Sequence, residues 1–130
     1  MSLFITFEGL PGSGKTIQLN FLAEFLIKDG YQVTVTRSPG GAPLTETPGT
    51  ISIAKNVCAV TQTLLEFAAR RELINDVIAP ALKRGEIVLC EGFCDATYAY
   101  CGFGHGADLP AIETLEDFVC GTLRPDLTIF

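Results

Sequence analysis

Short apolar runs alternate along this chain with longer segments in which apolar residues recur at helical spacing. The short runs are rich in aromatic and β-branched residues, and their length is typical of buried strands. Glycine and proline residues stand between many of these segments and mark the turns. The pattern predicts strands at residues 3–7, 31–36, 87–91 and 126–130.

The longer segments predict three helices, over residues 17–29, about 62–83, and 109–123. The first contains neither Gly nor Pro and is followed by Gly30, a residue typical of the position after a helix. Thr61 is the expected N-cap of the second helix, and Pro80 is expected to kink it. Pro110 falls in the first turn of the third, where proline is well tolerated.

A glycine-rich motif separates the first predicted strand from the first helix. It reads Gly9-Leu10-Pro11-Gly12-Ser13-Gly14-Lys15-Thr16 and matches the phosphate-binding P-loop, G-x-x-x-x-G-K-[ST]. The glycines allow backbone N–H groups to approach a phosphate closely, Lys15 would reach the β- and γ-phosphates, and the Thr16 hydroxyl would bind Mg²⁺. Because a strand precedes the motif and a helix follows it, the sequence predicts a site for ATP with Mg²⁺ rather than an ordinary glycine turn.

The order of the elements predicts the fold. Strands that alternate with helices and are apolar throughout indicate a parallel sheet with helices on both faces, in one α/β domain over residues 1–130. Residues 42–60 predict a loop with a short helix, and 92–106 a loop with one helical turn around 97–100. Ligands of such sheets lie beyond the carboxyl ends of the strands. The P-loop, residues 37–41 and residues 91–95 should therefore meet in one cleft.

Composition narrows the class of partner. The net charge of −6 disfavours a nucleic-acid duplex or a membrane surface as partner, since both call for a basic face. We expect a cytoplasmic chain, because the apolar runs are too short to span a membrane and Glu8 interrupts the first of them. Cys90, Cys94, Cys101 and His105 have zinc-ligand chemistry. Their spacing is not that of a common zinc module, which favours free thiols and a histidine in a loop.

Three charged residues are candidates for phosphoryl-transfer chemistry. Glu91, at the end of the third predicted strand, would hold the water shell of Mg²⁺, and the alternative is an N-cap or a solvated carboxylate. Arg37 and Arg70 would bind the phosphate or the base of an acceptor, and the alternative for each is an ordinary surface arginine.

Several motifs, in order, make the chain resemble the thymidylate kinase family. They are Phe7-Glu8-Gly9 before the P-loop, Thr36-Arg37-Ser38-Pro39-Gly40-Gly41, Phe67-Ala68-Ala69-Arg70, Asp95-Ala96-Thr97-Tyr98-Ala99-Tyr100, and Arg124-Pro125-Asp126. The resemblance implies a three-layer P-loop kinase fold, phosphorylation of dTMP by ATP and Mg²⁺ to give dTDP, and a homodimer. It also implies that Arg70 hydrogen-bonds thymine, that Thr97 lies at the base edge, that Tyr100 lies against the deoxyribose, and that Pro39 walls the pocket.

The chain departs from the family pattern at several of these positions. Pro11 and Ser38 replace acidic residues, Gly92 replaces the arginine that follows the third strand, and Glu66 replaces the aromatic residue expected to stack on thymine. The resemblance further implies that a lid, a last strand and a closing helix are absent from these residues. Three hypotheses follow: a thymidylate kinase, an ATP-binding interaction or regulatory module with little turnover, and a kinase for another nucleoside monophosphate.

Overall fold

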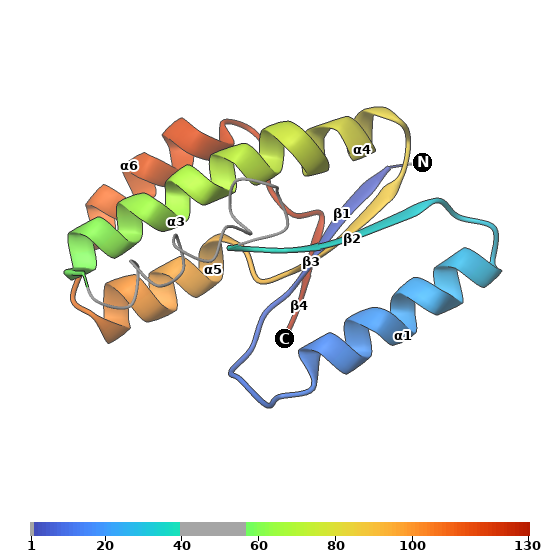
Figure 1. Ribbon diagram of the computed structural model, residues 1–130, viewed down its shortest axis with the longest axis horizontal. Helices are drawn as coiled ribbons and strands as arrows, with labels where there is room; N and C mark the ends of the chain where they lie inside the picture. Colours follow the sequence, from blue (N-terminus) through green and yellow to red (C-terminus); the bar gives the residue numbers. More distant parts are fainter. Residues whose placement is uncertain (1, 40–56) are drawn as a thin grey trace.

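Four parallel strands form the sheet in the part of the chain that the structure, a computed structural model, describes: residues 2–39 and 57–130 (Figure 1). They are β1 (Leu3–Phe7), β2 (Val33–Arg37), β3 (Ile87–Glu91) and β4 (Leu127–Ile129), in the order β2-β3-β1-β4. The register places Glu91 opposite both Phe7 and Arg37, so three strands end at the same level. The predicted parallel sheet is confirmed.

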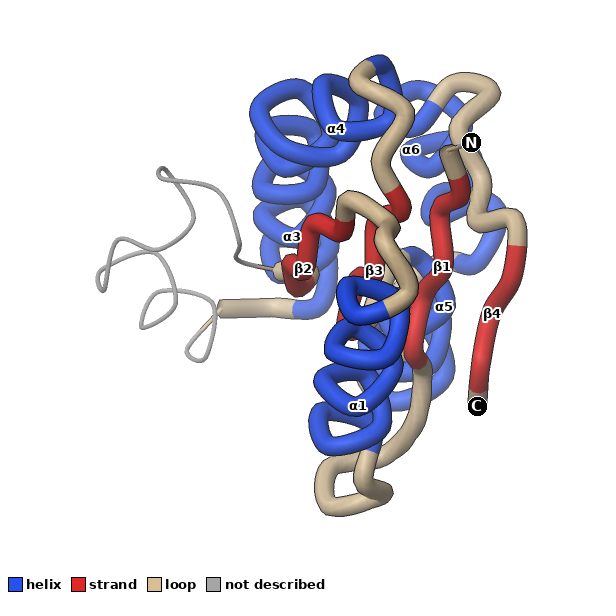
Figure 2. Tube along the Cα trace, turned by 90° about the vertical axis from the view of Figure 1, so that its right-hand side faces the viewer, coloured by secondary structure: helices blue, strands red, loops and turns tan. Residues whose placement is uncertain are grey.

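The helices cover both faces of this sheet. Helix α1 (Lys15–Lys28) lies on one face, while α3 (Ala59–Leu73), α4 (Ala79–Lys83) and α6 (Leu109–Cys120) lie on the other (Figures 1 and 2). This is the predicted three-layer α/β arrangement, and helices on both faces explain why the central strands are apolar throughout.

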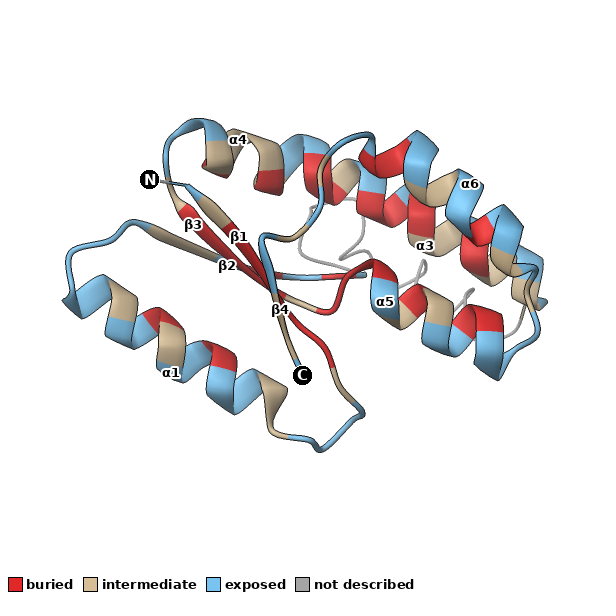
Figure 3. Ribbon diagram, turned by 180° about the vertical axis from the view of Figure 1, so that it is seen from behind, coloured by how far each residue is buried: buried red, intermediate tan, exposed pale blue. Residues whose placement is uncertain are grey.

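Alternation along each strand divides the core in two. Ile5 and Leu89 belong to the smaller core beneath α1, while Phe4, Val88 and Cys90 belong to the larger core beneath the other helices. Successive side chains of a strand point to opposite faces, so residues adjacent in sequence serve different cores. Figure 3 shows that β1 and β3, in the middle of the molecule, are mostly buried.

The structure contains the long helical segment that the sequence predicts for residues 62–83, but the segment has three parts. It consists of α3, a π-helical turn η2 (Ile74–Ile78) and α4. The prediction that Thr61 is its N-cap is wrong. Cys58 takes the extended N-cap conformation, and its carbonyl accepts the first helical bond from Gln62 N at 2.9 Å. The π-helical turn ends at Ile78, and Pro80, which lacks a backbone donor, lies in the first turn of α4.

Two other boundaries differ from the prediction. Residues 94–104, expected to be mainly loop, form α5 (Cys94–Thr97) and a π-helical continuation η3 (Tyr98–Gly104). Helix α6 ends at Cys120 rather than at residue 123. Its start agrees with the prediction, since Pro110 lies in the first turn and Asp108 caps the helix by accepting from Ala111 N at 3.2 Å.

The other predictions concern helix α1, the 42–60 loop and membrane-spanning segments. Helix α1 begins at Lys15, two residues before the predicted start, and ends just before Asp29 and Gly30. Most of the predicted 42–60 loop, together with Gly40 and Gly41, lies outside the described residues. None of the described helices is long and apolar enough to cross a membrane.

Candidate functional site

The P-loop leaves β1 at Phe7 and runs directly into α1. Gly14 takes φ +88° and forms the N-cap of α1, with no side-chain cap on the N–H groups of the first turn. A side chain with a Cβ is strained at this φ, which accounts for the glycine. Uncapped N–H groups at a helix N-terminus, with the positive end of the helix dipole, are suited to bind a phosphate.

Lys15 and Thr16 stand at the start of helix α1, where the P-loop ends. The Lys15 ammonium donates to the Gly9 carbonyl at 2.9 Å, so it lies across the loop itself. The Thr16 hydroxyl donates to the carboxylate of Glu91 at the end of β3. A hydroxyl and a carboxylate are hard oxygen donors of the kind that Mg²⁺ prefers, so this pair fits the ion implied by the sequence.

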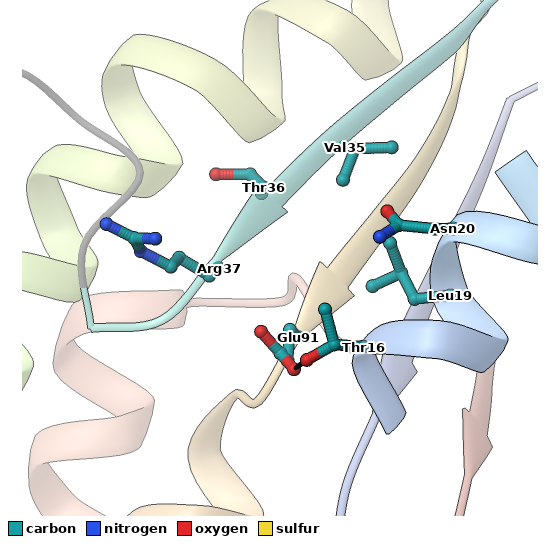
Figure 4. Close-up of a pocket in the computed structure, with 7 residues that line it drawn as sticks. All are labelled: Thr16, Leu19, Asn20, Val35, Thr36, Arg37 and Glu91. Atoms are coloured by element: carbon teal, nitrogen blue, oxygen red, sulfur yellow. Dashed lines mark hydrogen bonds between the residues drawn. The ribbon is translucent and has the colours of Figure 1, made fainter. Parts of the chain in front are cut away.

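A cavity of about 320 Å³ opens beside this pair. It lies between α1 and the ends of β2 and β3, and Figure 4 shows the residues that line it: Thr16, Leu19, Asn20, Val35, Thr36, Arg37 and Glu91. In this view the Arg37 guanidinium extends away from Glu91, although the two residues are paired in the sheet register. The volume is at the small end of the range for ligand pockets.

The connection after β2 carries the next predicted residues. Ser38 is buried and its N–H donates to the Glu91 carbonyl at 3.0 Å, so it continues the pairing of β2 with β3. Arg37 and Pro39, on either side of it, are exposed. Arg37 and Glu91 therefore lie at neighbouring strand ends, as predicted.

Arg70 is the most enclosed charged residue of the described chain, with no exposed surface. Its guanidinium donates to Ser38 Oγ at 3.1 Å, to Thr97 Oγ1 at 2.9 Å and to the Phe93 carbonyl at 3.2 Å. The rings of Phe67 and Phe93 lie 5.1 and 5.4 Å from its central carbon, in range of cation–π attraction. The alternative interpretation of Arg70 as a surface arginine is wrong.

Glu66 extends this network. Thr97 accepts from Arg70 and in turn donates to Glu66 Oε2 at 2.8 Å, so a carboxylate is linked to the buried guanidinium through one hydroxyl. Such a charge-assisted chain offsets the cost of removing a cation from water.

Tyr100, three residues after Thr97, lies on η3 with 41% of its surface exposed. We use the name acceptor shell for Ser38, Glu66, Arg70, Phe93 and Thr97.

Glu8 joins the P-loop to this shell. It is buried and accepts a hydrogen bond from Phe93 N at 2.7 Å. Burial raises the pKa of its carboxyl, because the charged form loses hydration that the one backbone donor restores only in part. Sequence reasoning assigned Glu8 no role in the site beyond its place in a motif. The available signal was a carboxylate directly after a buried strand.

Gly92 connects β3 to the shell through a constrained backbone. Its φ is +76°, and its N–H donates to the Phe7 carbonyl at 2.8 Å. A Cβ at this residue would lie 2.9 Å from the Ser38 carbonyl oxygen. Glycine is therefore required here by both conformation and space in the present arrangement.

The described structure does not bring together the four residues with zinc-ligand chemistry, Cys90, Cys94, Cys101 and His105. Among the described residues, no three His, Cys, Asp or Glu side chains form a metal-binding group. Cys90, Cys94 and Cys101 are buried free thiols, whereas His105 is exposed after η3. Burial raises the pKa of Cys90 to about 12, which keeps this thiol protonated and a poor metal ligand.

Comparisons with known proteins agree on one family. The family model described as thymidylate kinase matches residues 7–130. Thymidylate kinases of Pseudomonas fluorescens and of a Geobacter species are each 48% identical, over 98% and 99% of this chain and 62% and 59% of their own lengths. A thymidylate kinase structure from Ehrlichia chaffeensis superposes with a TM-score of 0.91 at 41% identity, over 98% of this chain and 72% of that one. The chain thus spans about three-fifths of the curated relatives.

Proposed function

Because the chain belongs to the thymidylate kinase family, we propose that its site transfers the γ-phosphoryl group of ATP to dTMP, giving dTDP and ADP for dTTP synthesis. The observation that carries the proposal is the hydrogen bond between Thr16 and Glu91, which joins the P-loop, with Lys15 donating to Gly9, to the end of β3. These three residues come from two distant segments of the chain, and together they offer a cation, a hydroxyl and a carboxylate beside an anion-binding loop.

On the ATP side, the backbone of residues 9–16 would cradle the phosphates, and Lys15 would release the Gly9 carbonyl to reach them. Thr16 and Glu91 would hold Mg²⁺, which neutralises charge on the transferred group. Arg37, at the adjacent strand end, would bind the acceptor phosphate. These contacts position the reactants in line, which is the main requirement of this chemistry.

On the dTMP side, Arg70 and Thr97 would contact the base, Tyr100 the deoxyribose, and Pro39 the wall of the pocket. The residues around Arg70 must move for it to do so, because its guanidinium has no exposed surface and donates to Ser38, Thr97 and Phe93. ATP and dTMP meet in the cytoplasm, where we propose that the reaction occurs, and we further propose that the family's homodimer is the working form.

One observation favours a second candidate function. Glu66 brings a carboxylate to the acceptor shell, and this negative charge opposes an approaching nucleotide. A chain that binds ATP with Mg²⁺ but turns over little, as an interaction or regulatory module, would match an intact P-loop beside such a shell.

An assay of product formation, together with a measurement of ATP binding, distinguishes the two candidate functions. The full chain is incubated with ATP, Mg²⁺ and dTMP, and dTDP is quantified by chromatography. Lys15→Ala is the negative control, and Lys28→Ala, at the far end of the same helix, is the matched positive control. Formation of dTDP that only Lys15→Ala abolishes supports the kinase. ATP binding without dTDP supports the module.

A further inference from the structure

Two buried thiols lie against each other where α5 begins and α6 ends. Cys94 is the first residue of α5 and Cys120 is the last residue of α6, and their sulfur atoms are 3.6 Å apart. The residues are separated by 26 positions in sequence, and both are buried. A disulfide has its sulfurs about 2.0 Å apart, so the two sulfur atoms must approach by roughly 1.6 Å to bond.

Each thiol also lines a cavity. Cys120 lies on the wall of an opening of about 610 Å³, together with Arg71, Lys83 and Arg124. Cys94 lies on the wall of a smaller one of about 100 Å³, beside Asp95. A small polar oxidant can therefore reach the pair from the Cys120 side, although neither residue is exposed on the outer surface.

The pair is electronically unequal. The contact between the two sulfur atoms lowers the pKa of the Cys120 thiol. The same contact and burial raise the pKa of Cys94. Cys120 lines the larger opening beside three cationic side chains, and the thiolate is the reactive form, so Cys120 is suited to attack an oxidant and Cys94 to resolve the product.

We propose that Cys94 and Cys120 form a redox site that closes reversibly to a disulfide when the protein meets a small hydroperoxide. The Cys120 thiolate attacks the terminal oxygen of the peroxide, and the O–O bond breaks to leave a sulfenic acid and, after protonation, water or an alcohol. The sulfur of Cys94 then attacks that of Cys120 and displaces hydroxide, which takes the Cys94 proton and leaves as water. The two thiols lose two electrons and two protons in total, and the peroxide gains them.

The bond would act on the acceptor shell. Cys94 follows Phe93, whose N–H donates to Glu8 and whose carbonyl accepts from Arg70. A covalent link at Cys94 would fasten this segment to α6 and restrict any rearrangement in which Arg70 exchanges its partners. The redox site itself does not depend on the proposed function, because it is defined by the two thiols alone.

The test uses the full chain, treated with hydrogen peroxide and then alkylated and mapped by mass spectrometry. We expect a linked peptide pair containing Cys94 and Cys120, with a loss of two hydrogens, that dithiothreitol reverses. Cys90→Ser and Cys101→Ser, at buried thiols, should leave this link unchanged. In Cys94→Ser, Cys120 should instead accumulate sulfenic acid, which a dimedone label detects.

Other outcomes would overturn the proposal. A disulfide that maps to another pair, or oxidation of Cys120 to sulfinic acid in the unmodified chain without a link to Cys94, would contradict it. The mapping of the unmodified protein decides the question even if a serine variant fails to fold.

Discussion

The P-loop and the acceptor shell lie on two sides of Glu8 and Gly92, yet they are built in opposite ways. The P-loop is polar, largely exposed, and leaves the N–H groups of the first turn of α1 without a side-chain cap. The shell is buried, and its central cation, Arg70, bonds to Ser38, Thr97 and Phe93. The P-loop therefore has backbone donors available for an anion, whereas the polar groups of the acceptor shell bond to one another.

This difference shows what binding would require on each side. A phosphate at the P-loop gains backbone donors and displaces one Lys15 bond. A base can reach Arg70 only if the residues that enclose it move, and any polar group left buried and unsatisfied by that movement costs about 1–3 kcal/mol. We therefore expect the nucleotide triphosphate to bind without rearrangement of the fold, and the monophosphate to bind only with rearrangement of the shell.

The largest expected effect is on stability, from Arg70→Met. This change leaves Ser38, Thr97 and Glu66 without their shared cation, and loss of one partner of a buried charged network costs roughly 3–5 kcal/mol. Urea unfolding gives the free energy. Arg84→Met is the control, because Arg84 is 57% exposed in its pair with Glu86 and should contribute less than about 1 kcal/mol. Equal losses in the two variants would show that the shell is not the stabilised part.

Next in size is Lys15→Ala, which probes the P-loop. Removing one charge-assisted phosphate contact costs roughly 1.5–3 kcal/mol, or about 10- to 100-fold in affinity for ATP with Mg²⁺. Calorimetric titration measures it, with Lys28→Ala as the control from the last turn of the same helix. If both variants bound ATP as the unmodified chain does, the loop would not be the nucleotide site.

Gly92→Ala tests the backbone that connects β3 to the acceptor shell. The substitution places a Cβ 2.9 Å from the Ser38 carbonyl at φ +76°, and strain of this kind costs about 1–3 kcal/mol. Gly30→Ala has a similar φ of +94° but meets no atom within 4 Å, so it reports the conformational cost alone. The difference in unfolding free energy between the variants isolates the contact. No difference would mean that the backbone at Gly92 shifts freely, which would also make an arginine there easy to accommodate.

Glu66→Phe tests whether residue 66 lies beside the base of bound dTMP. An aromatic ring that stacks on a base contributes about 1–3 kcal/mol, so dTMP should bind roughly tenfold tighter while ATP affinity stays the same. Glu66→Gln separates the loss of charge from the gain of a ring. An unchanged dTMP affinity in both variants would place the base away from Glu66.

The smallest effect concerns pH. The pKa of Glu8 is raised in the folded protein, so folding is disfavoured as the pH rises from the unfolded pKa of 4.5 through the folded value, and stability should fall over that interval. Glu8→Gln keeps an acceptor for Phe93 N and should flatten that part of the stability curve. Urea unfolding at several pH values checks it, and an unaltered slope would assign the dependence to other groups.

The sequence predicted the sheet and the P-loop well because both depend on local pattern. The β-branched runs marked all four strands, and residues 9–16 form a motif with fixed spacing. Only one turn of the helical segment 94–104 was predicted, because Gly102 and Gly104 weaken its helical pattern. The partners of Arg70 could not be deduced, since Ser38 and Thr97 lie 32 and 27 residues away and meet it only through folding.

Calorimetric titration of the full chain, first with ATP and Mg²⁺ and then with dTMP, compares the two sides of the site directly. We predict micromolar binding of ATP that Lys15→Ala weakens by at least about tenfold, and weaker binding of dTMP. Absence of ATP binding by the folded chain would contradict the assignment of the P-loop as a formed nucleotide site. Binding of dTMP as tight as that of ATP would contradict the contrast between the open loop and the closed acceptor shell.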